Sequence, residues 1–252
     1  MILICGPCVI ENFDKLERDA AAIKSIVDKY PDVDFYFKSS CIKENRTNLK
    51  NYRGLGFNIG LAFLRQLRDK YGIKITTDFH TSKQIEKYAH IVDLIQIPAF
   101  LAMQTGLVNT AAKIGKPIHI KKPQWLPPYD ISKPVSKVFD QTDVKVFVTD
   151  RGTTFGYGDV IFDPRHIKKM KRSGADKILV DITHLQNHSK IYSRTYAEPV
   201  GMAAIAAGAD GLYMESTINP DEAQCDSDCM IPMKFLDEYI DKFVKLHRFI
   251  NA

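Results

Sequence analysis

Residues 74–98 read KITTDFHTSKQIEKYAHIVDLIQIP, and this segment alone contains two candidate strands with an amphipathic pattern between them. Residues 74–78 and 94–98 are short runs rich in β-branched side chains, which is typical of strands. A strand, a helix and a second strand in this order form a βαβ unit, in which the two strands lie parallel. The segment therefore predicts a parallel sheet covered by helices.

The same alternation continues along the rest of the chain. Eight candidate strands can be counted, at residues 2–5, 34–40, 74–78, 94–98, 117–121, 145–149, 177–182 and 211–214. Eight units in this chain have about 31 residues each, which is the size of one βα module. We therefore predict an α/β fold, a (β/α)8 TIM barrel, with residues 1–252 in a single domain.

The helical patterns are clearest in two places. In residues 58–71 one helical stripe is formed by Ile59, Ala62, Phe63, Leu67 and Tyr71, and Gly72 follows directly as a stop signal. Residues 233–250 repeat apolar side chains at helical spacing and predict the last helix of the outer ring. Residues 121–145 contain several prolines, which predict a long loop or a short helix that begins late.

Composition excludes several classes of protein. Apolar residues make up 45% of the chain and charged residues 26%, which is ordinary for a globular protein and excludes disorder. A net charge of +5 is too small for a nucleic-acid binder, and we interpret the one dense basic run, residues 168–172, as a solvated helix face. No apolar run is long enough to span a membrane, so we expect a soluble, cytoplasmic protein. Five cysteines suit a reducing compartment, as thiols or metal ligands.

Polar side chains follow the predicted strands, at the end where a barrel carries its active site. Cations recur there after three different strands, and convergent cations favour a substrate with several negative charges, such as phosphate with carboxylate. For any one lysine, a solvated surface charge remains the commoner explanation. The cations are Lys38, Lys43, Arg46, Lys121 and Arg151.

A second group of strand-end residues has the donor atoms of a metal site. Cys8, His184, Glu215 and Asp226 offer a thiolate, an imidazole and two carboxylates, which suit zinc, iron or manganese. Their wide spacing is weak support, since a buried cysteine and a core histidine are commoner. Cys225 and the nearby Cys229 carry little weight as a zinc finger, because the chain has no second such pair.

Eight segments together resemble the 3-deoxy-D-manno-octulosonate 8-phosphate synthases, in order and over nearly the whole chain. The related 3-deoxy-D-arabino-heptulosonate 7-phosphate synthases are less similar at residues 43–47 and 96–101. The segments are GPCVIE at 6–11, FKSS at 37–40, KENRT at 43–47, TDFH at 77–80, QIPAFL at 96–101, KKPQ at 121–124, DRGTTFGY at 150–157 and DITH at 181–184.

The resemblance implies a reaction and a set of binding residues. It implies condensation of phosphoenolpyruvate with arabinose 5-phosphate on a TIM barrel, in a homotetramer that makes a precursor of lipopolysaccharide. The resemblance implies four catalytic residues, which are Lys43, Asp78, His184 and Asp226. Phosphoenolpyruvate would be bound by Lys38, Ser40, Lys43, Gln96, Ala99, Lys121 and Arg151, and the pentose by Asn45, Arg46, Thr47 and Asp78.

The resemblance also implies a divalent metal, because the metal-dependent branch of the family has cysteine at the position of Cys8 where the other branch has asparagine. The remaining three ligands would be His184, Glu215 and Asp226. The sequence departs from the family around the acceptor, where an arginine that reaches a neighbouring subunit's pentose phosphate is replaced by Met103. Further departures lie at residues 53–56, 191–194 and 215–218.

Three functions remain open from the sequence. The first is octulosonate 8-phosphate synthesis, and the second is the same chemistry on a different aldose or aldose phosphate. The third is a barrel that binds its ligand without turnover, which the complete set of donor and metal residues disfavours.

Overall fold

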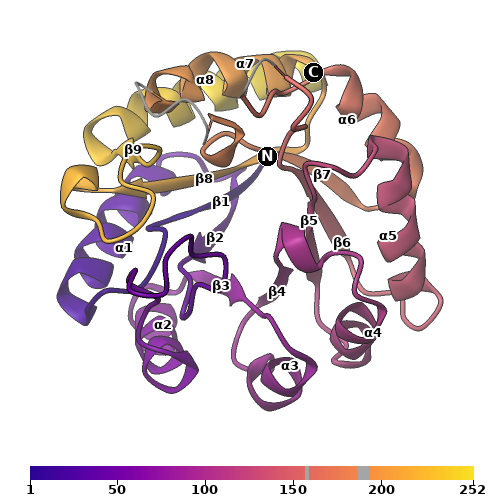
Figure 1. Cartoon of the computed structure of the whole chain (residues 1–252). Coiled ribbons are helices and arrows are strands. Elements are labelled where there is room, and N and C mark those ends of the chain that lie inside the picture. Colours follow the sequence, from indigo (N-terminus) through magenta and orange to yellow (C-terminus); the bar gives the residue numbers. More distant parts are fainter. Residues whose placement is uncertain (157–158, 187–192) are drawn as a thin grey trace.

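The computed structural model describes residues 1–156, 159–186 and 193–252 and contains a closed parallel barrel (Figure 1). Neighbouring strands pair in chain order, and β1 pairs with β8 to close the ring. The strands are β1 (Ile2–Gly6), β2 (Asp34–Lys38), β3 (Lys74–Asp78), β4 (Leu94–Ile97), β5 (Ile118–Lys122), β6 (Val146–Asp150), β7 (Lys177–Asp181) and β8 (Gly211–Thr217). The predicted TIM barrel and all eight predicted strands are confirmed, with ends that differ by two residues or fewer except at β8, which runs three residues further.

A short strand, β9 (Ile231–Pro232), was not predicted; it pairs with the end of β8 outside the ring. The α-helices are α1 (Phe13–Val27), α2 (Phe57–Tyr71), α3 (Ser82–Tyr88), α4 (Thr105–Lys113), α5 (Ser132–Phe139), α6 (Arg165–Met170), α7 (Ala197–Ala206) and α8 (Met233–Asn251). The 3-10 turns are η1 (Ala99–Leu101), η2 (Pro128–Ile131), η3 (Lys171–Ser173), η4 (His184–Gln186), η5 (Ser193–Tyr196) and η6 (Pro220–Glu222).

The helix predictions are confirmed in position and corrected in detail. Gly72 ends α2 in the left-handed conformation, as expected from a glycine stop signal. The predicted stripe of α2 is confirmed only in part: Leu67 is buried and Phe63 and Tyr71 are half-buried, but Ile59 and Ala62 are exposed. The buried face consists of Phe57, Gly60, Leu61, Leu64 and Leu67. The proline-rich segment forms η2 and then the short helix α5, the second of the two forms expected for it.

The barrel strands alternate between two environments, as the period of two in a strand requires. On β8, Leu212 and Met214 point outward into the apolar shell under the helices, whereas Tyr213 belongs to a separate cluster inside the barrel. That inner layer is formed by Ile2, Ile4, Tyr36, Leu94, Phe147, Leu179 and Tyr213. Inward positions one step further along the strands carry polar side chains, so the barrel interior changes from apolar to charged toward one end.

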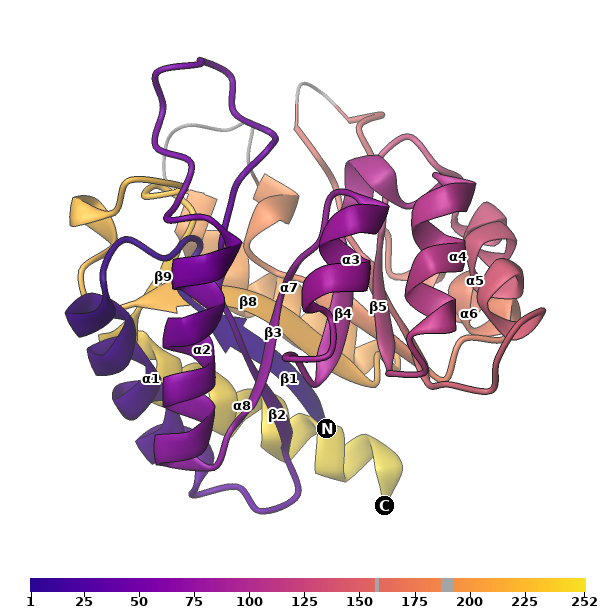
Figure 2. The ribbon, with the colours of Figure 1, turned by 90° about the horizontal axis from the view of Figure 1, so that it is seen from below.

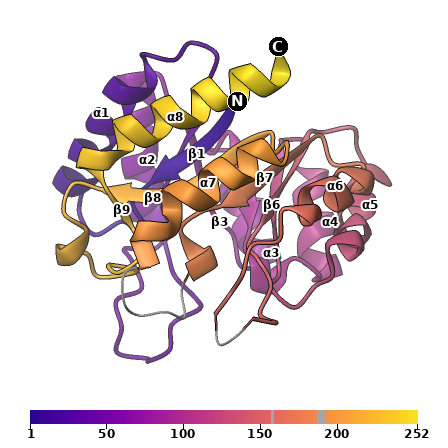
Figure 3. The ribbon, with the colours of Figure 1, turned by 90° about the horizontal axis from the view of Figure 1, so that it is seen from above.

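The charged end of the barrel lies opposite the chain termini. Figures 2 and 3 show both termini on one side of the molecule and the long connection from β2 to α2 projecting from the other. The basic run at residues 168–172 lies on α6 and η3, where Lys168, Lys171 and Arg172 are exposed, so the expected solvated face is confirmed. Among the described residues, no helix is long and apolar enough to cross a membrane.

Candidate active site

A cavity of about 400 Å³ opens at the carboxyl ends of the strands. This is the face where barrel enzymes carry their catalytic groups. Its lining is Lys38, Lys43, Glu44, Asn45, Asp78, His80, Gln96, Pro98, Ala99, Phe100, Leu101, Lys121, Arg151, His184, Tyr213 and Glu215. Most of the predicted binding residues thus lie around one space, although they come from five different strand ends.

Four cations converge on this cavity. Lys38 ends β2, Lys121 lies on β5, Arg151 follows β6, and Lys43 lies in the connection after β2; all four are buried. Arg151 forms no hydrogen bond or ion pair with another described side chain. Because buried cations are costly without counter-charge, such a guanidinium at a cavity wall is available for an anionic ligand.

The carboxylate of Asp78 faces these cations from β3. The Ser40 hydroxyl and the Gln96 side-chain amide both donate short hydrogen bonds to it. Burial raises the pKa of Asp78, but the ammonium groups of Lys38 and Lys43 outweigh burial and hold that pKa well below its usual range. Ser40, which was expected to bind phosphoenolpyruvate, contacts Asp78 and is not among the residues that line the cavity.

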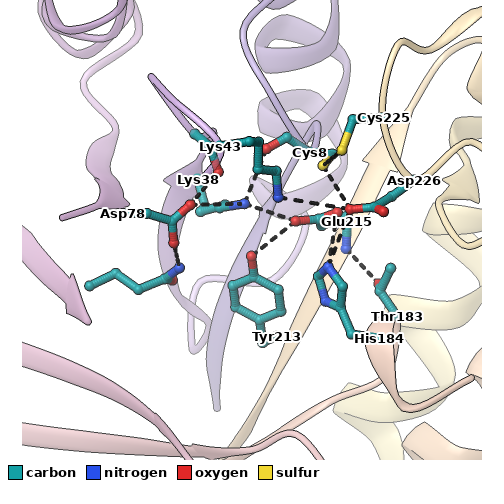
Figure 4. A network of polar contacts seen from close by, with 12 residues as sticks. Cys8, Lys38, Lys43, Asp78, Thr183, His184, Tyr213, Glu215, Cys225 and Asp226 are labelled. Atoms are coloured by element: carbon teal, nitrogen blue, oxygen red, sulfur yellow. Dashed lines mark hydrogen bonds and ion pairs between the residues drawn. The ribbon is translucent and has the colours of Figure 1, made fainter. Parts of the chain in front are cut away.

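The predicted metal ligands His184, Glu215 and Asp226 are brought together beside the cavity (Figure 4). His184 Nε2 lies 3.5 Å from Glu215 Oε2 and 3.6 Å from Asp226 Oδ2. The other ring nitrogen, Nδ1, lies 2.8 Å from Asp181 Oδ2. A carboxylate on one ring nitrogen sets the tautomer that leaves the other nitrogen as a ligand.

Cys8, two residues after the end of β1, belongs to a second cluster with Cys225 and Asp226, which shares Asp226 with the first. Its Sγ lies 3.0 Å from Asp226 Oδ2 and 3.0 Å from Cys225 Sγ. Burial raises the pKa of the Cys8 thiol, so binding an ion there would release its proton. The sequence contained no strong reason to expect Cys225 at the metal site. In the structure its sulfur lies beside that of Cys8. None of the five cysteines, all of which the structure describes, forms a disulfide.

The residues present fit a divalent ion. Glu215 Oε2 is buried without a hydrogen-bond partner, although its other oxygen accepts from Lys38 Nζ at 2.8 Å. Burial raises the pKa of Glu215, but Lys38 and His184 outweigh it and bring that pKa down to about 2. A charged, buried oxygen without a donor is a position that a cation satisfies. Thiolate, imidazole and carboxylate together suit a borderline divalent metal.

The residues expected to bind the pentose do not all lie around the cavity. Asn45 lines the cavity, but Thr47 is exposed outside it, and the Arg46 guanidinium lies 2.6 Å from Cys225 Sγ. Met103, in place of the family's arginine, is half-buried against the apolar shell. Arg194 donates to Asp221 at 2.8 Å and to the Ser227 carbonyl at 2.9 Å. Tyr157 of the DRGTTFGY segment and residues 191–192 of the altered loop lie outside the described residues.

Two buried polar residues that contact the candidate site were missed by the sequence reasoning. Asp181 forms an ion pair with Lys121 and also contacts His184, so it joins the cations to the ligand group. Tyr213 donates to Glu215 Oε1 at 3.1 Å. The sequence did contain a signal for both residues. Asp181 comes three residues before the predicted ligand His184, and Tyr213 comes two residues before the predicted ligand Glu215.

The chain is similar to known proteins along its whole length. A family model described as the DAHP synthetase I family matches residues 1–251. The 2-dehydro-3-deoxyphosphooctonate aldolase of Campylobacter jejuni strain RM1221 is 37% identical over 268 residues, which cover 100% of this chain and 98% of the relative. The proteins of the same name from Desulfotalea psychrophila and Syntrophobacter fumaroxidans are 38% and 37% identical, with 98% and 99% of this chain covered and 89% and 88% of the relatives.

Proposed function

The chain belongs to the DAHP synthetase I family, and from that premise we propose that it is an enzyme that condenses phosphoenolpyruvate with arabinose 5-phosphate and water. The products are 3-deoxy-D-manno-octulosonate 8-phosphate and inorganic phosphate. The names of the full-length relatives support this reaction. The observation that carries it is that Lys38, Lys121 and Arg151 line one cavity, beside two clusters of possible metal ligands that share Asp226.

Phosphoenolpyruvate has a phosphate and a carboxylate, and the cationic half of the cavity matches both groups. Arg151, Lys121, Lys38 and Lys43 all line the cavity, so both anionic groups can find a cationic partner. Gln96 and Ala99 complete the donor pocket, and Ser40 acts through Asp78. Charge-assisted hydrogen bonds from buried cations orient the donor as well as bind it.

The acceptor occupies the side of the cavity nearer Asn45 and Asp78. Arg46 and Thr47 lie on the same connection after β2, and they reach the pentose phosphate when that connection closes over it. Asp78, kept ionised by Lys38 and Lys43, accepts hydrogen bonds from the sugar hydroxyls.

The chemical step requires a weak nucleophile and an aldehyde at near-attack distance. Carbon 3 of phosphoenolpyruvate adds to the aldehyde, water adds at carbon 2, and the resulting hemiketal phosphate loses inorganic phosphate. Lys43, 3.8 Å from Asp226 Oδ2, is placed to donate a proton to the developing alkoxide. His184 lines the same cavity, Asp226 lies beside it, and together they handle the proton of the water.

Cys8, His184, Glu215 and Asp226 would hold a divalent metal such as manganese, iron or zinc. When bound there, such an ion supplies a Lewis acid for the aldehyde and acidifies water. Cys225, 3.0 Å from Cys8, is close enough to influence this site.

A second candidate is the same chemistry on a different aldose. Met103 supplies no charge for a phosphate, and Arg194 is already engaged by Asp221 and Ser227. These placements favour weak recognition of the acceptor's phosphate by this chain alone.

One experiment tests the proposed function. The protein is incubated with phosphoenolpyruvate, Mn²⁺ and, in parallel, arabinose 5-phosphate, erythrose 4-phosphate and unphosphorylated arabinose, and phosphate release is followed. Fastest turnover with arabinose 5-phosphate supports the main proposal, and fastest turnover with another aldose supports the second candidate. Binding of phosphoenolpyruvate without release of its phosphate in the presence of any of the aldoses would leave a non-catalytic barrel. The homotetramer and the cytoplasmic location expected from the resemblance belong to the same proposal; sedimentation of the protein checks the first.

A further inference from the structure

Tyr213 is the member of the inner barrel layer that reaches the candidate site. It is 1% exposed, and five of the six other side chains in that layer are aliphatic or phenylalanine. A phenylalanine would fill the same volume without placing a hydroxyl in the barrel. The hydroxyl of Tyr213 is therefore a feature that packing alone does not require.

The hydroxyl has one particular partner. It donates to Glu215 Oε1 at 3.1 Å, and Lys38 Nζ donates to the same oxygen at 2.8 Å (Figure 4). Glu215 Oε2 receives no hydrogen bond and lies 3.5 Å from His184 Nε2. Two donors on one oxygen prevent the carboxylate from rotating, so Oε2 alone faces the ligand group.

The ring of Tyr213 makes a separate contact, with Lys121. Lys121 Nζ lies 3.5 Å from the ring centroid, a close cation–π contact inside the barrel. Lys121 also forms an ion pair with Asp181, whose Oδ2 is 2.8 Å from His184 Nδ1. Lys121 is thus connected to His184 through Asp181 and to Glu215 through Tyr213.

We propose that Tyr213 is a positioning residue: its hydroxyl holds Glu215 as a ligand through one oxygen, and its ring holds the Lys121 ammonium toward phosphoenolpyruvate. This inference rests on the proposed function, since it needs a metal at Glu215 and an anionic donor at Lys121. One side chain then sets the geometry of both the metal ligand and the donor-binding cation.

Two variants separate the hydroxyl from the ring. Tyr213→Phe keeps the ring and removes the hydroxyl, so metal affinity should fall about 10-fold to 100-fold, the usual effect of losing a hydrogen-bond partner of a metal ligand. Its affinity for phosphoenolpyruvate should stay within about twofold, because the ring still faces Lys121. Tyr213→Leu removes both and should also weaken phosphoenolpyruvate binding about tenfold or more.

Tyr36→Phe is the matched control. Tyr36 belongs to the same inner layer, and its ring also lies under a lysine, Lys74, 4.9 Å from the ring centroid. It lies on β2, its ring faces the lysine that begins β3, and among the described residues it forms no hydrogen bond with Glu215. Its variant should therefore match the parent in every binding measurement.

The measurements use metal-depleted full-length protein. Co²⁺ is titrated against a competing chelator, and its visible absorption spectrum reports ligand number and geometry; phosphoenolpyruvate binding is measured by calorimetry without metal. A weakened Co²⁺ affinity and an altered spectrum in Tyr213→Phe, with Tyr36→Phe unchanged, support the inference.

Two results would overturn it. If the parent binds Co²⁺ and Tyr213→Phe binds it with the same affinity and spectrum, the positioning role of the hydroxyl is wrong while the metal site stands. If Tyr213→Leu binds phosphoenolpyruvate as tightly as the parent, the role of the ring is wrong. A parent that binds no Co²⁺ would instead overturn the proposed metal site and this inference with it.

Discussion

Replacing Asp181 by asparagine tests the connection between the cations and the candidate metal ligands. Asp181 is fully buried, and its Oδ1 accepts from the backbone N–H groups of Thr183 at 3.0 Å and of His184 at 2.9 Å. Its Oδ2 accepts from Lys121 and lies 2.8 Å from His184 Nδ1. Asparagine can retain the first oxygen and its two bonds, but it places an amide NH2 against an ammonium and a ring N–H.

The expected loss of unfolding free energy follows from the Lys121 ammonium, which the substitution leaves buried without its carboxylate partner. Removing one partner of a buried ion pair costs about 3–5 kcal/mol of unfolding free energy, because the other charge stays buried. Burial already lowers the pKa of Lys121, and Arg151 lowers it further, so Lys121 can lose its proton in the variant. We therefore expect the lower end, about 3 kcal/mol, which corresponds to a Tm about 6–12 °C lower for a chain of this size. Loss of the fixed His184 tautomer should weaken metal affinity about 10-fold to 100-fold.

Thermal unfolding and Co²⁺ titration measure the two effects separately. Asp32→Asn is the control, since Asp32 forms an ion pair with Arg248 at 2.5 Å on the exposed surface, where such pairs contribute little. The reasoning is refuted if Asp181→Asn melts within about 2 °C of the parent and binds the metal as tightly, because the Lys121 pair would then have no energetic consequence.

Further outcomes can be checked by standard assays. Removing the metal with a chelator should abolish activity, and Cys8→Ala should prevent its recovery on adding Mn²⁺, whereas Cys225→Ala should recover; equal recovery of both variants would show that Cys8 is not a ligand. Arg151→Ala should weaken phosphoenolpyruvate binding about tenfold to a hundredfold in calorimetry, from about 1.5–3 kcal/mol per charged hydrogen bond, with little change in Tm. Met103→Arg should raise kcat/KM for arabinose 5-phosphate, and no response would mean that another cation already binds its phosphate. Burial and the Lys121 charge hold the pKa of His119 down at about 3. Since unfolded histidine titrates near about 6.5, the unfolded state takes the proton first, and unfolding free energy should fall by about 1.4 kcal/mol per pH unit below that pH; a denaturant series in His119→Gln should show a shallower acid slope.

The barrel could be predicted because its strands and helices leave a regular pattern. Each strand is a short apolar run, and the helix between two strands begins and ends at recognisable residues such as Thr81, whose side chain forms a capping box with Gln84. The buried face of α2 was predicted less well. Gly60 is buried on that face, and a Cβ atom added to it would lie only 2.8 Å from Cys41 Sγ. A pattern of hydrophobic residues cannot predict a helix face that packs closely through a glycine.

Strand-end residues of the site were predictable for the same geometric reason. Lys38, Asp78 and Lys121 lie at inward positions near the ends of their strands, and closing the barrel brings those positions together. The linking residues were not predictable from type alone. Asp181 and Tyr213 lie close in sequence to predicted ligands, but only the structure shows that each contacts a lysine and a candidate ligand.

The positions of loop side chains could not be predicted from the sequence. Their orientation depends on the residues that they contact and not on a place in a strand. Cys225 is separated from Cys8 by most of the chain, and no spacing rule predicts that their sulfur atoms lie 3.0 Å apart. Arg46 has the right charge for a phosphate, yet its guanidinium lies on Cys225. Arg53 donates to the Lys43 carbonyl at 3.2 Å and pairs with Glu44, so it supports the connection instead of facing the cavity. On the proposed function, phosphoenolpyruvate binds mainly to side chains at strand ends that already lie together, whereas acceptor binding depends on loop side chains that must leave such partners to bind a second phosphate. Recognition of the acceptor is therefore the part of the reaction that is most open to change by substitution in this chain.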